Sequence, residues 1–313
     1  MADVPKAELK SQVRDYWNEF SCDTQVAAAE KFSREYFEQI ERFRYRDQPF
    51  IHSFAQFTRY RDRRVLEVGF GAGTDFIQWL RAGARATGID LTPEALANLS
   101  HRIETYGLPA PEQIMVADAE NLPFPNDTFD LGYSFGVLHH SPDTEKAIAE
   151  LVRVTRPGGQ IKIMLYNRHS IYTFNQWVKF GLLRGKPFQS LATILWNHME
   201  SVGTKGYTRP ELREILSRLP LHSIVVRTEM TSGDFLSAAA MAPLNKLYRL
   251  ALRLAGDTYE WQPADYVARE EVGLDDVRPK VAQSSSKEPV FTGNRLGFYH
   301  CITASKSEAV APA

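Results

Sequence analysis

The sequence is poor in cysteine and has no long apolar run. Its 313 residues include two cysteines, Cys22 and Cys301. They lie far apart, without a C-x-x-C pair or a histidine-rich neighbourhood, which argues against a disulfide framework and a structural zinc site. No stretch reaches ~18 consecutive apolar residues, and the N-terminus lacks the apolar segment of a secretory signal. We therefore expect a soluble protein in a reducing, cytoplasmic compartment.

An excess of charge of one sign is also lacking. The sequence has 37 Lys and Arg against 38 Asp and Glu, and a formal net charge of -1. Such a chain presents no overall field to a polyanion, so nucleic acid is not an expected partner. Arginines gather between residues 42 and 64, but acids are interspersed among them, and we interpret this region as a solvated face. The sequence gives no indication of the oligomeric state.

The most informative stretch is RVLEVGFGAGTD, residues 64–75, an apolar run that ends in three alternating glycines. The apolar half is typical of a strand buried on both faces. Gly69, Gly71 and Gly73 permit backbone dihedrals closed to other residues and allow a ligand to approach the main chain. Because the sequence that follows is helical, we predict a strand, a tight turn and a helix, with a cofactor at the turn.

The spacing of these glycines differs from the dinucleotide fingerprint. That fingerprint is G-x-G-x-x-G with an acid ~20 residues further on, whereas here the third glycine comes one residue early. Glu67, two residues before the first glycine, would repel a pyrophosphate. Residues 84–90 predict a second strand, which ends in Asp90, placed to accept both hydroxyls of a ribose. A ribose-containing cofactor without phosphates fits best, so a nicotinamide oxidoreductase is disfavoured.

The phrases VLEVGFGAGTD and GIDLTPEAL resemble the first two motifs of the class I S-adenosylmethionine-dependent methyltransferases. The phrase FDLGYSFGVLHHSPDTEKAIAELVRVTRPGGQ, which begins at Phe129, resembles the branch that includes the ubiquinone and menaquinone C-methyltransferases. Together the motifs cover approximately residues 63–167. The resemblance implies S-adenosyl-L-methionine as the cofactor.

A third predicted strand, residues 113–119, contains another acid near its end, Asp118. By itself such an aspartate is more often a helix cap or a turn residue. The resemblance implies instead that Asp118 takes the exocyclic amine of adenine and that the backbone amide of Ala119 meets a ring nitrogen. The cofactor-binding residues implied in this way are Glu67, Gly69, Gly71, Gly73, Asp90, Leu91, Asp118, Ala119 and Phe135.

Two adjacent histidines, His139 and His140, follow the predicted fourth strand, residues 129–135, at the edge where doubly wound sheets bind ligands. We predict no metal site, because consecutive loop residues diverge and no third ligand lies nearby with metal spacing. Either histidine could act as a general base near pH 7. Alternatively, His139 packs near the cofactor's thioether and His140 caps the next helix. A base is not strictly required: aligning the acceptor with the methyl group of a sulfonium donor can supply much of the reduction in the activation barrier.

The predicted fold class is α/β, with a Rossmann-like, doubly wound, mostly parallel sheet of seven strands. Residues 61–304 form this methyltransferase core, and residues 1–60 form a helical cover that either packs on it or closes over the cofactor as a lid. A helical insert at residues 168–207 interrupts the core on the acceptor side. A second insert, residues 231–294, separates strands six and seven, and residues 305–313 are expected to be a disordered tail.

Within the second insert, residues 242–254 show an apolar stripe opposite a basic face. A helix of this kind could touch a membrane, but packing on the core explains the same pattern. Membrane contact is therefore possible and not favoured.

These features predict an enzyme that methylates an oxygen, carbon or sulfur atom of a small acceptor. The alternative is a catalytically silent scaffold or regulator that binds S-adenosylmethionine or S-adenosylhomocysteine. An acceptor with an apolar or aromatic part is favoured by four aromatic residues of the first insert: Tyr172, Phe174, Trp177 and Trp196.

Overall fold

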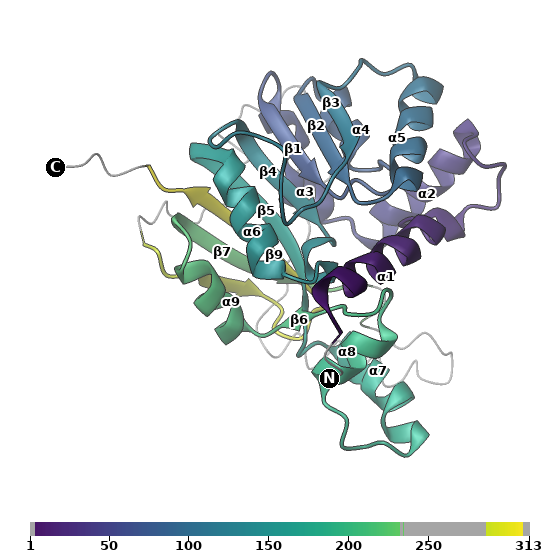
Figure 1. The fold of residues 1–313 in the computed structure, drawn as a ribbon, viewed down its shortest axis with the longest axis vertical. Helices are drawn as coiled ribbons and strands as arrows, with labels where there is room; N and C mark the ends of the chain where they lie inside the picture. The colour runs from purple at the N-terminus through teal and green to yellow at the C-terminus, as the bar shows by residue number, and fades with distance from the viewer. Residues whose placement is uncertain (1–3, 232–233, 235–285, 309–313) are drawn as a thin grey trace.

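The computed structural model describes residues 4–231, 234 and 286–308 (Figure 1). The helix predicted at residues 242–254 and most of the second insert lie outside the described residues.

A single, mostly parallel sheet forms the centre of the molecule (Figure 1). Its strand order is β3-β2-β1-β4-β5-β9-β7-β8, with β6 beside β5. β9 lies antiparallel between β5 and β7, and the other neighbours are parallel. The α/β doubly wound fold predicted from the sequence is confirmed, and two short strands, β6 and β8, extend the seven predicted ones. The strands are β1 (Arg64–Val68), β2 (Arg85–Asp90), β3 (Gln113–Val116), β4 (Phe129–Phe135), β5 (Thr155–Asn167), β6 (Gly206–Tyr207), β7 (Leu221–Glu229), β8 (Val290–Gly293) and β9 (Tyr299–Lys306).

The last strand extends further than the sequence predicts. β9 continues through Lys306, so the first two residues of the predicted disordered tail belong to the sheet. The Lys306 ammonium explains this, because it contacts Asp127 Oδ1 at 2.6 Å and the carbonyl oxygens of Arg153 and Thr155 at 3.1 and 2.7 Å. The prediction of disorder is therefore wrong for residues 305 and 306.

Two hydrophobic cores lie on opposite faces of the sheet, as the alternation of side chains along a strand requires. In β1, Val65 packs into one core with Trp79 and Tyr133, whereas Leu66 packs into the other with Ile148. The helices that cover the faces are α4 (Phe76–Arg81), α5 (Pro93–Tyr106), α6 (Thr144–Val154) and α9 (Arg209–Ser217).

Side-chain caps mark the starts of α5 and α9, and a glycine marks the end of α5. Thr92 accepts a hydrogen bond from the Ala95 amide at the start of α5, and Gly107 ends this helix in the left-handed conformation at φ 60°. Thr208 and Glu211 form the capping box of α9. These local devices fix where each helix meets the sheet.

The N-terminal cover consists of α1 (Lys6–Glu19), α2 (Arg34–Asp47) and α3 (Ile51–Ala55). α2 buries Tyr36, Phe37 and Ile40. The fully buried Arg102 of α5 joins α2 to the core, because it donates to the Phe37 carbonyl and pairs with Glu41 at 3.0 Å. α1 buries only Leu9 and Val13.

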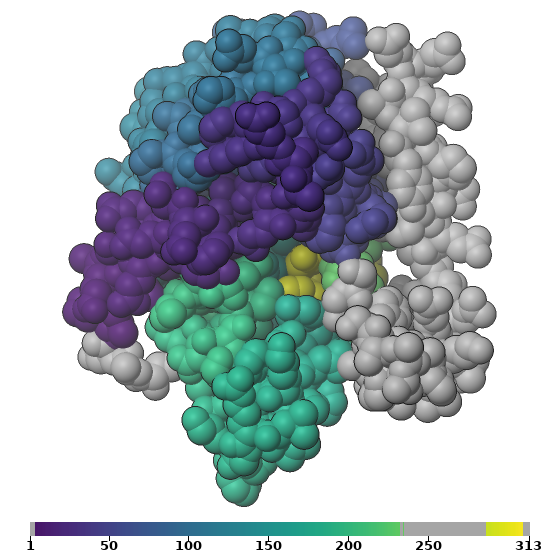
Figure 2. Space-filling view, turned by 90° about the vertical axis from the view of Figure 1, so that its right-hand side faces the viewer, coloured from purple at the N-terminus to yellow at the C-terminus, as the bar shows by residue number. Residues whose placement is uncertain are grey.

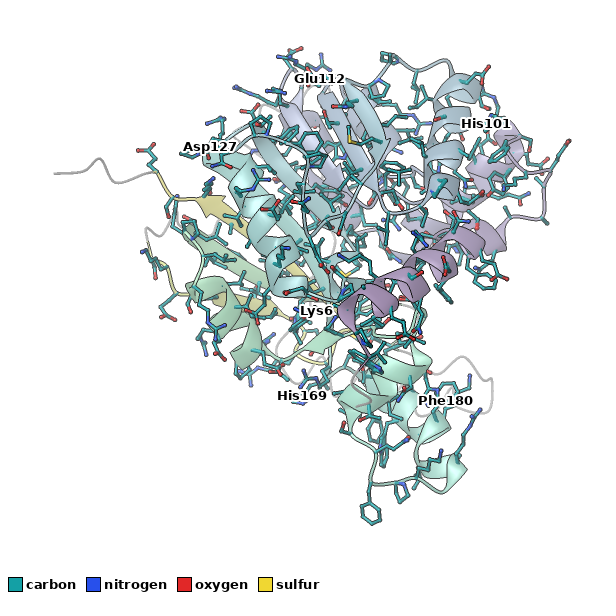
Figure 3. All side chains as sticks on the ribbon, viewed as in Figure 1. Lys6, His101, Glu112, Asp127, His169 and Phe180 are labelled. Carbon is teal, nitrogen blue, oxygen red and sulfur yellow. The ribbon has the colours of Figure 1, made fainter. Side chains whose placement is uncertain are left out.

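The segment at residues 168–207 contains α7 (Ile171–Phe180) and α8 (Leu191–His198), which project from the body of the molecule (Figures 1 and 2). We refer to residues 171–198 as the α7–α8 hairpin. Phe180 lies near its far end (Figure 3). Four short 3-10 helices complete the described structure: η1 (Thr24–Val26), η2 (Phe57–Tyr60), η3 (Leu138–His140) and η4 (Leu182–Arg184).

Candidate active site

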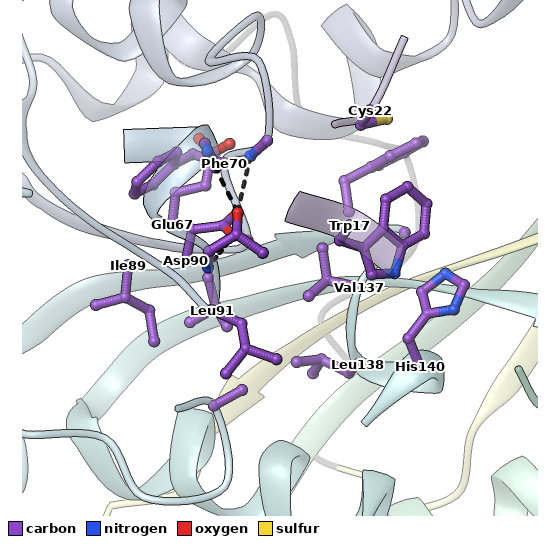
Figure 4. A pocket seen from close by; sticks show the side chains of 18 of the residues that line it. Trp17, Cys22, Glu67, Phe70, Ile89, Asp90, Leu91, Val137, Leu138 and His140 are labelled. Atoms are coloured by element: carbon purple, nitrogen blue, oxygen red, sulfur yellow. Dashed lines mark hydrogen bonds between the residues drawn. The ribbon is translucent and has the colours of Figure 1, made fainter. Parts of the chain in front are cut away.

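A pocket lies at the carboxyl ends of β1, β2, β3 and β4, with α1 on one side (Figure 4). The turns after these four strands form its floor, and Val13 and Trp17 of α1 contribute to its wall. Most of the residues predicted to bind the cofactor line it: Glu67, Gly69, Gly71, Asp90, Leu91, Asp118, Ala119 and Phe135.

The glycine turn after β1 has two different roles. Gly69 and Gly71 line the pocket with φ of +80° and +50°. A Cβ on Gly69 would lie 2.3 Å from Val137, so a side chain there has no space. Gly73 does not line the pocket, and a Cβ there would lie 2.7 Å from Leu99 of α5. The first two glycines therefore open the main chain to a ligand, whereas the third allows α5 to pack closely.

Asp90 is fixed at the end of β2 by hydrogen bonds to both of its carboxylate oxygens (Figure 4). The Gly71 amide donates to Oδ2 at 3.0 Å, and the Thr92 amide and hydroxyl both donate to Oδ1 at 3.0 Å. Burial raises the pKa of Asp90, although these hydrogen bonds oppose the shift. Because a carboxylate oxygen can accept more than one hydrogen bond, Oδ2 can still accept a ligand hydroxyl.

Asp118 contacts the N-terminal cover, which the sequence did not predict. Its Oδ2 lies 2.6 Å from the ammonium of Lys10 in α1, and Lys10 also contacts Glu120 at 2.7 Å. Partial burial opposes protonation of Lys10, but the hydrogen bonds to Asp118 and Glu120 raise its pKa. No local sequence pattern could reveal this contact, because the partners are 108 and 110 residues apart.

Glu67 lies in a group of buried charges at the base of the pocket. Its Oε2 accepts a hydrogen bond from Trp79 Nε1 at 2.7 Å. Burial, with Asp75 nearby, raises the pKa of Glu67 well above its usual value. Burial alone would also raise the pKa of Asp75, but Arg44 lowers it, together with hydroxyl hydrogen bonds from Tyr133 and Tyr45.

Arg44 is a pocket residue that the sequence analysis missed. Its Nε and Nη2 donate to the two carboxylate oxygens of Asp75 at 2.9 and 2.8 Å, and its Nη1 lies 3.3 Å from Asp23. Its side chain is 11% exposed, so the interpretation of residues 42–64 as a solvated face is wrong at this position. Arg44 and Asp75 are 31 residues apart in the sequence, so no local pattern indicates that they pair. Asp75 directly follows the glycine turn.

The structure places the two histidines in different surroundings. His140 lines the pocket, with its ring centroid 5.0 Å from that of Trp17. His139 does not line it; its ring is fully buried and lies 3.8 Å from the ring of Tyr166. Burial, with His140 and Lys205 nearby, lowers the pKa of His139 well below its usual value. Of the two predicted candidates, His140 is therefore the one that can face a pocket ligand.

The expectation that His140 caps the next helix is wrong, because the side chain of Asp143 caps α6 by accepting from the Lys146 amide at 3.0 Å. The His140 ring contacts another part of the chain instead. Its Nδ1 lies 2.9 Å from Thr204 Oγ1 and 3.1 Å from Ser201 Oγ. These hydroxyls fix the orientation of the ring.

Glu200 is the second residue that sequence reasoning missed. Its Oε2 lies 3.2 Å from His140 Nε2, and the Tyr166 hydroxyl donates to its carboxylate at 3.0 Å. Glu200 has a φ of +51°, a backbone conformation uncommon for residues other than glycine and often found at functional sites. Potential ligand atoms of His139, His140 and Glu200 all lie within 4.8 Å of one another. The argument that no third metal ligand lies nearby is therefore wrong, although the absence of a metal site stays a prediction.

The fold is that of the class I S-adenosylmethionine-dependent methyltransferases. Residues 66–163 match the family described as "Methyltransferase domain". The match covers β1 to β5, the half of the sheet that carries the pocket.

Two curated relatives show the extent of the similarity. Phosphatidylethanolamine N-methyltransferase of Cereibacter sphaeroides is 36% identical over 104 residues, which are 33% of this chain and 51% of that protein. Malonyl-[acyl-carrier protein] O-methyltransferase of Erwinia billingiae is 32% identical over 140 residues, which are 43% of this chain and 53% of that protein. The matched region thus spans about half the length of these relatives.

A solved structure shares this fold. Magnesium protoporphyrin IX methyltransferase of Synechocystis PCC 6803 superposes with a TM-score of 0.54 at 14% identity, over 95% of this chain and 100% of that one. At this identity the similarity concerns the fold alone.

Proposed function

We propose that this chain is an enzyme that binds S-adenosyl-L-methionine and transfers its methyl group to a small molecule. The observation that carries the proposal is that one pocket contains the glycine turn, Asp90 and Asp118. The pocket also fits such a cofactor because Gly69 and Gly71 line it without side chains, so that a ligand can approach the main chain there.

Each part of the cofactor has a candidate partner. We assign Asp90 to the ribose hydroxyls, Asp118 and the Ala119 amide to adenine, and Arg44 to the carboxylate of the methionine part. A guanidinium has five N–H donors, and three nitrogens of Arg44 already hold Asp75 and Asp23 in place. The group is therefore oriented by its acids and retains donors for a ligand.

When bound, S-adenosylmethionine supplies an electrophilic methyl group on a good leaving group. The residues of this chain then have to align the acceptor and, where it carries a proton, remove that proton. We assign proton removal to His140 and Glu200 together, because His140 lies on the pocket wall and Glu200 contacts its Nε2. His139 supports the loop through its contact with Tyr166.

We propose an acceptor with an apolar or aromatic part, methylated at oxygen, carbon or sulfur. Trp17 and Val137 of the pocket wall support this proposal. The four aromatic residues of the insert on which the expectation was based do not line this pocket, and two of them, Phe174 and Trp177, stack on each other in the α7–α8 hairpin.

Calorimetry with S-adenosylhomocysteine and NAD tests the cofactor assignment, and we expect binding of the first only. Equal affinity for both would overturn it. A screen of metabolite extracts with methyl-labelled cofactor then tests for turnover. Amines belong in the screen, because the relatives include an N-methyltransferase. A protein that binds the cofactor but methylates nothing would instead be a silent scaffold.

A further inference from the structure

The far end of the α7–α8 hairpin exposes large apolar side chains. Phe188 is 99% exposed, Leu183 76% and Leu182 47%, and every residue from 182 to 188 is exposed. Single apolar residues at a surface are normal, but three within seven consecutive exposed residues form a patch that marks an interaction site.

Contacts within the hairpin fix this exposed turn. Trp177 Nε1 donates to the Gln189 carbonyl at 3.0 Å, and the Lys186 amide donates to the Gly181 carbonyl at 2.9 Å. At the base of the turn, the ring of Phe180 stacks on His198 with centroids 4.4 Å apart. Leu183 and Phe188 therefore point outward from an ordered turn that projects from the body (Figure 2).

The same turn is basic. The sequence contains no aspartate or glutamate between residues 151 and 199, although the chain as a whole is balanced. Lys179, Arg184 and Lys186 lie in the hairpin, and none of them forms an ion pair with an acid among residues 4–231 and 286–308. Partial burial lowers the pKa of His198, and the positive charges of Arg184 and Lys186 lower it further.

We propose that the end of the α7–α8 hairpin docks on the surface of an anionic lipid bilayer. Apolar side chains flanked by lysine and arginine are the composition of segments that lie in the membrane interface. No described helix is long and apolar enough to cross a membrane.

A bilayer explains this surface better than a protein partner does. A stable protein interface buries ~800 Å² on each side, whereas here the apolar surface comes from three side chains at the end of a projecting hairpin. A projecting tip enters the headgroup region without needing a complementary partner surface. The uncompensated cations match the negative potential of anionic headgroups.

Docking through this turn would place a bilayer beside the acceptor side of the pocket. The hairpin directly follows β5, and α8 leads through Met199 to Glu200, which contacts His140 of the pocket wall. An apolar acceptor dissolved in the bilayer would then lie near the site. This consequence rests on the proposed function, but the docking itself does not.

Cosedimentation of the full chain with vesicles tests the proposal without cofactor or acceptor. With phosphatidylcholine containing phosphatidylglycerol we expect at least about tenfold stronger binding than with phosphatidylcholine alone, and weakening at high salt. The variant Leu183→Ser/Phe188→Ser should lose about tenfold or more of this binding, and Arg184→Gln/Lys186→Gln should lose the preference for anionic vesicles. Val290→Ser, which alters an exposed apolar residue of β8, should bind like the wild type.

Two results would overturn the proposal. One is the absence of vesicle binding, or equal binding by the wild type and Leu183→Ser/Phe188→Ser. The other is a dimer in sedimentation velocity that the same variant dissociates, without any vesicle binding, because the turn would then contact a second copy of the chain. Circular dichroism of each variant establishes that the fold is intact.

Discussion

Glu200 Oε2 lies 3.2 Å from His140 Nε2, at the wall of the pocket and 60 residues away in the sequence. On the other side of the ring, Nδ1 contacts the hydroxyls of Ser201 and Thr204, which can either donate or accept a hydrogen bond. Both ring nitrogens of His140 therefore lie within 3.2 Å of polar groups. This property suits a group that takes up a proton during a reaction.

We expect Glu200→Gln and His140→Gln each to lower turnover at pH 7 by about 10²–10⁴-fold, the usual contribution of a general base. The affinity for S-adenosylhomocysteine should change little. If the two residues act as a unit, the double variant should lose no more than either single variant. The measurements are initial rates and calorimetry, with Glu214→Gln on the exposed surface of α9 as the control.

The same variants report on the acceptor. If it is a phenol or a thiol, higher pH supplies its ionised form and should restore much of the lost rate. A carbon acceptor would show less recovery. Fully active single variants would eliminate the base and leave positioning as the mechanism.

Asp90→Ala should weaken cofactor binding at least about tenfold, because it removes charge-assisted hydrogen bonds to the ribose worth ~1.5–3 kcal/mol each. Isothermal titration with S-adenosylhomocysteine measures the effect. Glu145→Ala is the control, since Glu145 is an exposed acid of α6 that does not line the pocket. An unchanged dissociation constant in a folded Asp90→Ala protein would contradict the ribose assignment.

The elements with local signals could be predicted from the sequence. The glycine turn, the strand ending in Asp90 and the caps at Thr92 and Thr208 each depend on neighbouring residues, and the structure contains them all. Gly73 shows the limit of this approach. The sequence predicted correctly that Gly73 lies in a turn. Only the structure shows that the missing side chain makes room for Leu99 of α5 and does not expose the main chain to a ligand.

The missed residues are all held by contacts between distant segments. Arg44 belongs to an arginine-rich stretch, and nothing near it indicates that Asp75 will pair with it across the pocket. Glu200 follows the apolar helix α8, and Lys10 lies on α1, which buries only two residues. Neither setting indicates a contact with the pocket. Their partners depend on how the cover and the hairpin pack on the sheet, which no short sequence pattern specifies.

Removal of residues 1–19 should impair cofactor binding and turnover more than stability. α1 buries only Leu9 and Val13, so its removal should cost little of the core. It does, however, carry Trp17 of the pocket wall and Lys10, which holds Asp118. Thermal unfolding and calorimetry on the same protein separate the two effects. A large fall in melting temperature with normal cofactor affinity would show that α1 packs on the core and is not a lid.

Chelation should leave turnover unchanged, because the Tyr166 hydroxyl already donates a hydrogen bond to the Glu200 carboxylate at 3.0 Å and no metal ion is needed to hold it. The test compares rates before and after dialysis against EDTA and after addition of zinc or magnesium. Restoration of activity by a divalent ion after chelation, and its absence in Glu200→Gln, would establish a metal site formed by His139, His140 and Glu200.

Stability should fall as the pH drops below ~6.5, the usual pKa of histidine. His300 of β9 is buried. Burial, with Arg209 nearby, lowers its pKa to about 3. In the unfolded chain this histidine takes up a proton near pH 6.5, whereas in the folded chain it stays neutral. The unfolded state therefore binds more protons, and the free energy of unfolding decreases as the pH falls from the unfolded towards the folded pKa.

Replacing His300 with Gln removes this difference in proton uptake. Between pH 6.5 and pH 5 we expect the wild type to lose ~1.6 kcal/mol more than His300→Gln, because the slope approaches ~1.4 kcal/mol for each pH unit only below the unfolded pKa. Urea unfolding of both proteins at the two pH values measures the loss, and the comparison of slopes cancels any constant effect of the substitution. His101→Gln is the control, because His101 is an exposed residue of α5. Equal pH slopes for the wild type and His300→Gln would show that His300 does not remain neutral in the folded protein.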